Sequence, residues 1–309
     1  MRRARAIAGV MALAAAVVSA CGTGPVAWQP SGGSPSATTT LRAADRAETL
    51  RALIDSAAMG GRWPAIVILP PAYRAEPARR FPVIYLLHGA GGDHRSWLRS
   101  SDIARMLETR PVICVCVCGR TYGWYVDSPV RPDSQVQMHV TRELVQFVDA
   151  NFRTVARREG RALCGYSMGG HGAITLAAKR PDLFSSASSL AGIMDIARWP
   201  DNWRIAAALG PLEANRGLWK SHSAMGLAGT FADGARGARI MIDCGVDDFA
   251  YPENREFHAL LERLGVRHAY RERPGGHDWR FWTTHLAEHI DFHLESFRMA
   301  GVAGPAQDG

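Results

Sequence analysis

The sequence predicts an α/β fold with a doubly wound, mainly parallel β-sheet. Short and continuously apolar segments, such as residues 81–87 and 112–118, alternate with stretches whose apolar residues recur at helical spacing. Continuous apolar runs are typical of parallel strands that helices cover on both faces. The chain has 309 residues, of which 47% are hydrophobic and 21% charged. This length and composition suit one large α/β domain.

The first twenty residues predict a targeting segment. Three arginines within the first five residues precede an apolar run over 7–18 that ends in small residues, which is typical of a signal peptide. The run closes on Val18-Ser19-Ala20-Cys21 and is similar to the lipobox of bacterial lipoproteins, whose cysteine is lipidated. We expect a lipoprotein signal peptide over 1–20 and lipidation at Cys21. An ordinary cleaved signal peptide is the alternative. The expected location is the bacterial cell envelope, lipid-anchored and periplasmic or extracellular.

Residues 21–40 are rich in Gly, Pro, Ser and Thr and predict a flexible tether, followed by one folded domain over 41–300 and a disordered tail over 301–309. Residues 41–59 leave two interpretations open, a helix lined by leucines and Ile54 or a first strand over 52–58. Strands are predicted over 64–70, 81–87, 112–118, 161–164, 184–190, 238–244 and 268–273. Helices are predicted over 97–107, 140–152, 173–178, 253–264 and 279–297.

The segment Gly165-Tyr166-Ser167-Met168-Gly169 ends a predicted strand and opens a predicted helix. In a strand–turn–helix of this pattern the serine lies on a sharp, strained turn that exposes its hydroxyl. A Cβ at either flanking glycine would clash with the neighbouring strand or helix. A serine hydroxyl needs a base that takes its proton, and a histidine held by a carboxylate is the expected base. Ser167 is therefore a candidate nucleophile.

Two late loops supply candidates for the base and the acid. His277 follows the last predicted strand, and Asp247 and Asp248 follow the strand before it, so all three emerge at the carboxyl edge of the sheet. Neighbouring side chains in an extended loop point in different directions, so only one aspartate can reach the imidazole. Phe249 and Ala250 are expected to pack this loop down.

The segment His88-Gly89-Ala90-Gly91-Gly92 follows another predicted strand. Its small residues allow backbone N–H groups to approach a carbonyl oxygen closely. The expected oxyanion donors are the N–H of Ala90 and the N–H of Met168, the residue after the candidate nucleophile.

Together these segments resemble the esterase D-like branch of the α/β-hydrolases. This branch includes S-formylglutathione hydrolases, the feruloyl and acetylxylan esterases of carbohydrate esterase family one, and secreted mycolyltransferases. The matching pieces cover roughly residues 62–297 and are Tyr85-Leu86-Leu87-His88-Gly89, Gly165-Tyr166-Ser167-Met168-Gly169-Gly170, Cys244-Gly245 with Asp248 following, and Gly275-Gly276-His277-Asp278-Trp279.

The resemblance implies an α/β-hydrolase fold in which Ser167 is the nucleophile and His277 the base. It implies that Asp248, three residues after Gly245, is the acid, and that Ala90 and Met168 are the oxyanion donors. Residues 193–237 carry three tryptophans and match no substrate-defining motif. They follow the strand after the nucleophile helix, so we expect a cap-like insertion over the active site.

The implied activity is that of a serine carboxylic-ester hydrolase working through an acyl-enzyme, on short-chain or carbohydrate-linked acyl esters. Acyl transfer of the mycolyltransferase type and a catalytically silent binding lipoprotein are the alternatives. No cofactor and no metal are expected, because no Cys/His spacing fits a zinc site. A small-molecule or carbohydrate ester is the expected partner. We expect the protein to contact the membrane only through its lipid anchor. Nucleic acid is not expected as a partner, because no basic run with interleaved aromatics follows the signal segment.

Five cysteines other than Cys21 are interpreted as small buried hydrophobes, with one disulfide as the open alternative.

Overall fold

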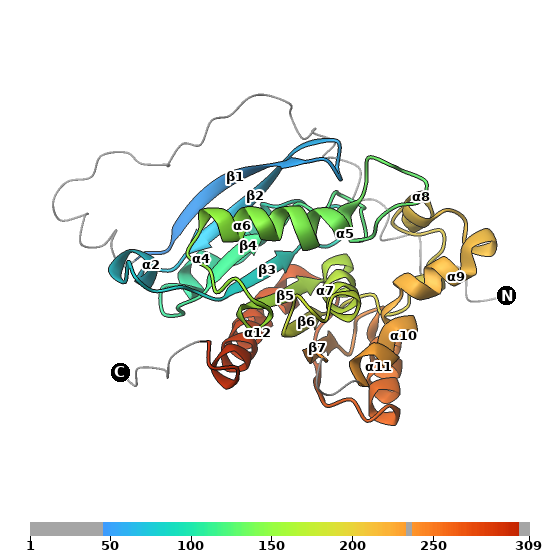
Figure 1. The fold of residues 1–309 in the computed structure, drawn as a ribbon. Coiled ribbons are helices and arrows are strands. Elements are labelled where there is room, and N and C mark those ends of the chain that lie inside the picture. The colour runs from blue at the N-terminus through green and yellow to red at the C-terminus, as the bar shows by residue number, and fades with distance from the viewer. Residues whose placement is uncertain (1–45, 233–236, 303–309) are drawn as a thin grey trace. The chain divides into compact units, whose positions relative to one another are not determined.

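The computed structural model describes residues 46–232 and 237–302. The predicted signal peptide, the lipidation at Cys21, the tether over 21–40 and the tail beyond residue 302 lie outside the described residues. The described part is built on one sheet of eight strands in the order β1-β2-β4-β3-β5-β6-β7-β8 (Figure 1).

The sheet is mainly parallel, with an antiparallel hairpin at one edge. β1 pairs antiparallel with β2, and β2 pairs antiparallel with β4, whereas every other neighbouring pair is parallel. This arrangement confirms the predicted α/β fold. The strands are β1 (Glu48–Ser56), β2 (Gly61–Leu69), β3 (Val83–Leu87), β4 (Ile113–Cys116), β5 (Arg161–Tyr166), β6 (Ser186–Leu190), β7 (Arg239–Gly245) and β8 (His268–Arg273).

Helices cover both faces of the sheet, as the continuously apolar strands predict. Alternate residues of β3 join two separate buried clusters, with Tyr85 in one and Leu86 in the other. The first cluster includes residues of α6 (Val145–Asn151), α7 (Met168–Lys179) and α11 (Tyr251–Arg263). The second includes residues of α3 (Ser96–Ser100), α4 (Ile103–Met106) and α12 (Trp279–Met299). Shorter helical segments are α2 (Ala72–Ala75), α5 (Val136–Met138) and η3 (Arg158–Gly160).

The cysteines lie inside these clusters. Cys114, Cys116, Cys164 and Cys244 are buried free thiols that belong to the second cluster, and Cys118 is buried as well. This confirms their interpretation as small hydrophobes and leaves the alternative of a disulfide without support.

Two predicted elements differ from the structure. The ambiguous segment 41–59 contains strand β1, which begins at Glu48, four residues before the predicted strand. The single helix predicted over 97–107 is wrong, because α3 ends before Ser101 and α4 begins at Ile103. The Ser101 hydroxyl donates to the Trp97 carbonyl at 2.6 Å, and the Ser101 backbone is extended. A serine side chain that bonds to a helix carbonyl in this way competes with continuation of the helix.

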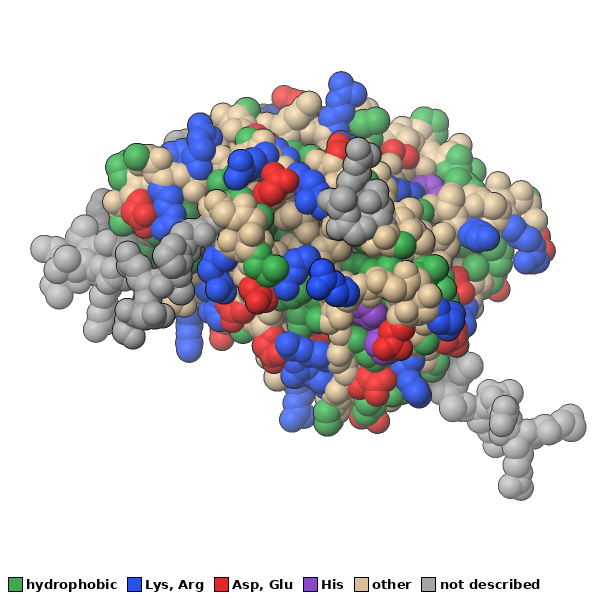
Figure 2. Space-filling view, turned by 60° about the horizontal axis from the view of Figure 1, so that its bottom comes forward, with side chains coloured by type: hydrophobic (Ala, Val, Ile, Leu, Met, Phe, Trp, Pro, Cys, Tyr) green, Lys and Arg blue, Asp and Glu red, His purple; other side chains and the backbone are tan. Residues whose placement is uncertain are grey.

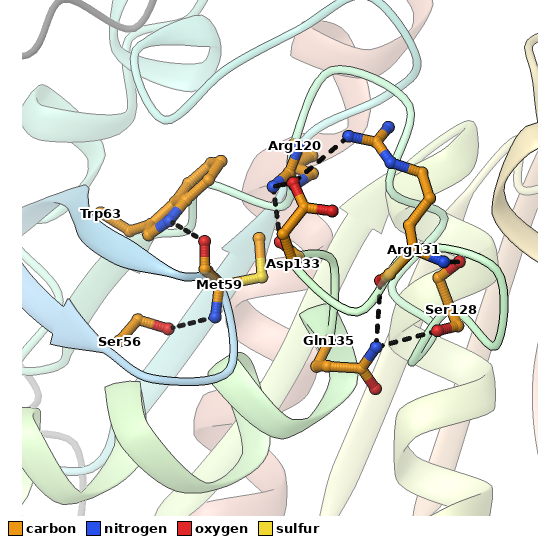
Figure 3. Close-up of polar contacts among 8 residues, drawn as sticks. All are labelled: Ser56, Met59, Trp63, Arg120, Ser128, Arg131, Asp133 and Gln135. Carbon is orange, nitrogen blue, oxygen red and sulfur yellow. Dashed lines mark hydrogen bonds and ion pairs between the residues drawn. The ribbon is translucent and has the colours of Figure 1, made fainter.

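Figure 3 shows hydrogen bonds within the β1–β2 hairpin and others within the loop after β4, and the two segments meet where Arg120 lies over Trp63. The Arg120 guanidinium donates to the Asp133 carboxylate at 2.8 Å and lies 5.0 Å from the ring centre of Trp63. The Trp63 indole N–H donates to the Met59 carbonyl at 3.2 Å. Beyond this loop, η2 (His139–Leu144) is one π-helical stretch inside the helix predicted over 140–152.

The described part of the segment between β6 and β7, which omits residues 233–236, contains four short helical elements and one longer helix. They are η4 (Ile196–Arg198), α8 (Ile205–Leu209), α9 (Leu212–His222), α10 (Ala224–Leu227) and η5 (Ala228–Ala232). Figure 1 shows α8 and α9 beyond one end of the sheet rather than over its faces. Trp219 is fully buried in this segment, and its indole N–H donates to the Gly210 carbonyl. Trp219 is therefore a core residue.

Charged side chains are mixed on the face drawn in Figure 2, where basic and acidic groups are interspersed with hydrophobic ones. Within the two described ranges, no helix is both long enough and apolar enough to cross a bilayer.

Candidate active site

Ser167 lies on the turn between β5 and α7, at the carboxyl end of its strand. Its backbone has φ 54° and ψ −124°, a conformation that costs a non-glycine residue energy and is concentrated at functional sites. A Cβ at Gly165 would lie 2.2 Å from the Gly169 carbonyl oxygen, and a Cβ at Gly169 would lie 2.2 Å from the Leu87 carbonyl oxygen. Both glycines are therefore required by close backbone contact, as the sequence pattern predicts.

The three residues predicted for the site form a continuous hydrogen-bonded chain. The Ser167 hydroxyl donates to His277 Nε2 at 2.8 Å. His277 Nδ1 donates to the Asp248 carboxylate, at 2.8 Å from one oxygen and 3.0 Å from the other. The Asp248 side chain is fully buried, whereas the His277 side chain keeps 18% of its surface exposed. The imidazole is therefore fixed at Nδ1 by a buried carboxylate, while part of its surface is exposed to solvent.

Of the two adjacent aspartates, Asp248 reaches the imidazole. Asp247 is exposed, and its backbone N–H donates to the Gly275 carbonyl at 3.0 Å. Asp248 also accepts from the Ala250 N–H at 2.8 Å, which fixes the carboxylate in the loop. Asp278, beside His277 in sequence, instead caps α12 by accepting from the Phe281 N–H at 2.9 Å.

Ala90 and Met168 lie on two loops that meet at Ser167. Met168 is the first residue of α7, so its N–H has no acceptor within the helix. A Cβ built on Gly89 would lie 3.1 Å from the Ser167 Cβ, which places the segment that carries Ala90 directly beside the serine. The segment that carries Ala90 and the first turn of α7 thus both lie next to Ser167.

His88 braces this loop from inside. Its Nδ1–H donates to the Gly89 carbonyl at 2.8 Å, and its Nε2 accepts from the Gly119 N–H at 3.1 Å. Burial lowers the pKa of His88 to about 4, so the ring is neutral at pH 7 and this tautomer satisfies both nitrogens. The Tyr125 hydroxyl donates to the His88 carbonyl at 3.0 Å and joins the loop after β4 to the same support.

Aromatic rings surround His277 on two sides. The Phe249 ring centre lies 4.4 Å from that of His277, and the Trp282 ring lies 5.1 Å away in an edge-to-face arrangement. Ala250 is fully buried, as expected, whereas Phe249 packs against neighbouring rings and keeps 42% of its surface exposed. Trp203 stacks on the Phe249 ring at 5.4 Å, which keeps Phe249 at the site instead of in the core.

Three further histidines are buried structural residues. His171 is fully buried and its Nδ1 contacts the Ile193 carbonyl at 3.1 Å. His289 and His293, on α12, are fully buried beneath the sheet. Across residues 46–232 and 237–302, no group of three or more metal-ligating side chains is placed to hold a metal ion.

A serine–histidine–aspartate chain on a strained strand-to-helix turn of a mainly parallel sheet defines an α/β-hydrolase type of site. Residues 56–293 match the model of the Esterase family. The match covers more than half of the chain, so this protein belongs to that family.

Curated relatives agree with this assignment. A protein named as an esterase from Mycobacterium tuberculosis strain H37Rv is 32% identical over 277 residues, covering 78% of this chain and 59% of the relative. The chain thus spans about three fifths of that relative's length. An acetyl esterase from Caldicellulosiruptor saccharolyticus is 29% identical over 222 residues, covering 68% of this chain and 82% of the relative.

Solved structures share the fold. A ferulic acid esterase superposes with a TM-score of 0.71 at 23% identity, covering 81% of this chain and 99% of that chain. An S-formylglutathione hydrolase from Agrobacterium tumefaciens gives a TM-score of 0.71 at 24% identity, covering 81% and 96%.

Proposed function

We propose that this protein is a serine carboxylic-ester hydrolase in which Ser167 is the nucleophile, His277 the general base and Asp248 the orienting acid. The observation that carries the proposal is the unbroken hydrogen-bond chain from Asp248 through His277 to the Ser167 hydroxyl. Membership in the Esterase family supports the same reaction class.

In the proposed reaction, the Ser167 oxygen attacks the ester carbonyl while its proton passes to His277 Nε2. The N–H groups of Ala90 and Met168 stabilise the negative oxygen of the tetrahedral intermediate. His277 then gives the proton to the departing alcohol, which leaves an acyl group on Ser167. A water molecule attacks this acyl-enzyme by the same route, with His277 again as the base. Loss of one oxyanion donor costs a factor of about 10²–10³ in kcat in comparable enzymes.

The proposed substrates are short-chain or carbohydrate-linked acyl esters. A panel of p-nitrophenyl esters, feruloyl esters and acetylated xylan tests this directly, with Ser167→Ala as the background. Release of acid from at least one ester by the wild-type protein, and not by Ser167→Ala, is the expected result. If neither protein releases acid from any ester, the silent binding lipoprotein becomes the better account.

Acyl transfer to another alcohol uses the same acyl-enzyme and differs only in the acceptor. It is measured by adding an alcohol during turnover and comparing the new ester formed with the acid released. Hydrolysis is the expected main outcome, and a new ester as the main product would favour the transferase alternative.

We also propose that the mature protein is anchored to the bacterial envelope through lipidated Cys21. The motive is the small-residue run that ends on this cysteine. Cys21→Ser is expected to lose lipid labelling and to leave the membrane fraction. Unchanged labelling and unchanged membrane association of Cys21→Ser would contradict the proposed anchor.

A further inference from the structure

A cavity of about 290 Å³ lies beside the candidate active site. It is lined by Arg198, Trp199, Phe249, Pro252 and Glu253. Its volume is at the lower end of the roughly 300–1,000 Å³ of small-molecule sites, so it suits one ring rather than a long chain. The reaction proposed above assigns this cavity no role.

The cavity lies on the imidazole side of the site. Phe249 forms part of its wall, and the centre of the Phe249 ring is 4.4 Å from that of His277. His277 must give a proton to the departing alcohol oxygen, so the alcohol portion of the ester has to lie next to this ring. The cavity that shares a wall with His277 is therefore placed for the alcohol portion and not for the acyl chain.

A buried carboxyl group holds the part of the wall that Trp199 forms. Glu253 is 2% exposed, and its two oxygens accept from the Trp199 indole N–H and from the Met194 backbone N–H, each at 3.1 Å. The Trp199 ring lies edge-on to Phe249 with centres 5.4 Å apart. A side chain fixed in this way provides a preorganised surface for a ligand.

Phe249 also packs against Trp203. The two rings stack at 5.4 Å with an interplanar angle of 28°. The Trp203 carbonyl accepts from the Trp124 indole N–H at 3.0 Å, and the Trp203 backbone has a positive φ of 43°. Strain of this kind persists only where the surroundings enforce it and is concentrated at ligand sites.

We propose that this cavity binds the alcohol portion of the ester, and that it selects alcohols built on a single hydroxyl-bearing ring, such as a sugar. The inference rests on the proposed function. The aromatic rings of Trp199 and Phe249 in the lining suit the C–H groups of such a ring, and Arg198 and Glu253 add polar groups to the lining. Trp199 and Phe249 are then specificity-determining residues, and Glu253 is a positioning residue that acts through Trp199.

The same site would accept an alcohol after the acyl-enzyme has formed. The acceptor hydroxyl gives its proton to His277 Nε2 while its oxygen attacks the acyl carbon. The bond from that carbon to the Ser167 oxygen breaks, and Ser167 recovers the proton. Capture of the acyl-enzyme by an added alcohol therefore measures how well the cavity binds that alcohol once the original leaving group has departed.

The test uses p-nitrophenyl acetate with methyl glucoside or methanol as added acceptor. The measured quantity is the acetylated acceptor formed per p-nitrophenol released. We expect capture by methyl glucoside to saturate with its concentration in the wild-type protein. In Trp199→Leu we expect this capture to fall about fivefold relative to capture by methanol, since an aromatic contact accounts for about 1 kcal/mol and 1.4 kcal/mol is tenfold. The preference among p-nitrophenyl acetate, butyrate and hexanoate should keep its order.

Trp63→Leu is the matched control. Trp63 is a half-buried tryptophan on β2 whose indole N–H also donates one hydrogen bond, to the Met59 carbonyl (Figure 3). It is not among the residues that line the cavity. Its capture ratio should match the wild-type ratio. Phe249→Leu is a second cavity variant that keeps the core intact, because Phe249 is 42% exposed, and it should behave like Trp199→Leu.

Three results would overturn the inference. One is the absence of saturable capture by methyl glucoside in the wild-type protein. Another is a changed acyl-chain preference in Trp199→Leu and Phe249→Leu with unchanged capture, which would assign the cavity to the acyl group. The third is an equal change in Trp63→Leu. Failure of the proposed function is distinguishable from all three, because then no p-nitrophenol is released at all.

Discussion

Two serine–histidine hydrogen bonds in this protein have the same length in different surroundings. At the carboxyl edge of the sheet, the Ser167 oxygen lies 2.8 Å from His277 Nε2. Beneath α12, the Ser188 oxygen lies 2.8 Å from His293 Nε2. The residue types and the distance are thus identical. Some other feature must distinguish the candidate active site from the structural contact.

The second nitrogen of each ring makes the difference. Asp248 accepts from His277 Nδ1, whereas Ser186 contacts His293 Nδ1 at 2.8 Å. His293 and its two serines are fully buried, and this burial lowers the pKa of His293 well below its usual value. A serine–histidine pair can work as a proton relay only with a carboxylate behind the ring and with access for substrate.

The largest expected effect is a loss of ester turnover that occurs on substitution of Ser167 and not of Ser188. Ser167→Ala should lower kcat by about 10⁶, because loss of the nucleophile in a comparable triad has that effect. Ser188→Ala should keep its activity and lose about 1–3 kcal/mol of unfolding free energy, since it leaves a buried ring nitrogen without a partner. Ester turnover and urea unfolding of both variants check this. Comparable losses of activity in Ser167→Ala and Ser188→Ala would contradict the assignment of Ser167 alone as the nucleophile.

The next effect separates the two aspartates of the acid loop. Asp248→Asn should lower kcat by about 10⁴, because the amide no longer holds the correct imidazole tautomer. Asp247→Asn, with an exposed side chain, is the matched control and should keep most of its activity. Circular dichroism confirms that both variants are folded. The opposite pattern in turnover would make Asp247 the acid.

Acid should weaken the folded state through its buried histidines. Burial lowers the pKa of His88 to about 4 and the pKa of His293 well below its ordinary value near 6.5. Below pH 6.5 the unfolded chain takes up protons that these rings do not, so stability falls as the pH drops from 6.5 toward 4. The slope is about 1.4 kcal/mol per pH unit for each such ring.

Urea unfolding at pH 7, 6 and 5 measures that slope. His293→Gln should show a shallower slope than the wild-type protein, because glutamine can bond to both serines and does not titrate. Equal slopes in the two proteins would exclude His293 as a source of the acid sensitivity.

The smallest expected effect is that of a chelator. The proposed reaction uses only side chains and backbone N–H groups of this chain, so EDTA should leave ester turnover unchanged. Loss of activity in EDTA that an added divalent metal restores would contradict this mechanism.

Much of the site follows from short stretches of sequence. Gly165 is required by its close contact with Gly169, and Gly169 by its close contact with Leu87 at the end of the neighbouring strand. The position of Asp248 after Gly245 and that of His277 after β8 follow from where two strands end. Parallel strands bring such loops to one edge, so the pattern predicts their meeting.

The substrate side depends on contacts between distant segments. Phe249 stacks on Trp203, which lies 46 residues earlier in the chain. Glu253 is the partner of Trp199 across 54 residues. Neither pairing leaves a periodic or motif-like pattern in the sequence. The sequence therefore predicts a cap-like insertion over 193–237 but not the residues outside it that contact its tryptophans. The apolar spacing does not predict the break at Ser101, because there one hydroxyl contact competes with continuation of the helix.

Covalent labelling by a fluorophosphonate tests the central claim most directly, because phosphonylation needs a serine that an adjacent base has activated. The full-length protein is treated and the adduct is located by peptide mass spectrometry. The account predicts one adduct, on Ser167, which is absent in Ser167→Ala and forms far more slowly in His277→Ala. An unlabelled wild-type protein, an adduct on another serine such as Ser188, or equally fast labelling of His277→Ala would contradict it.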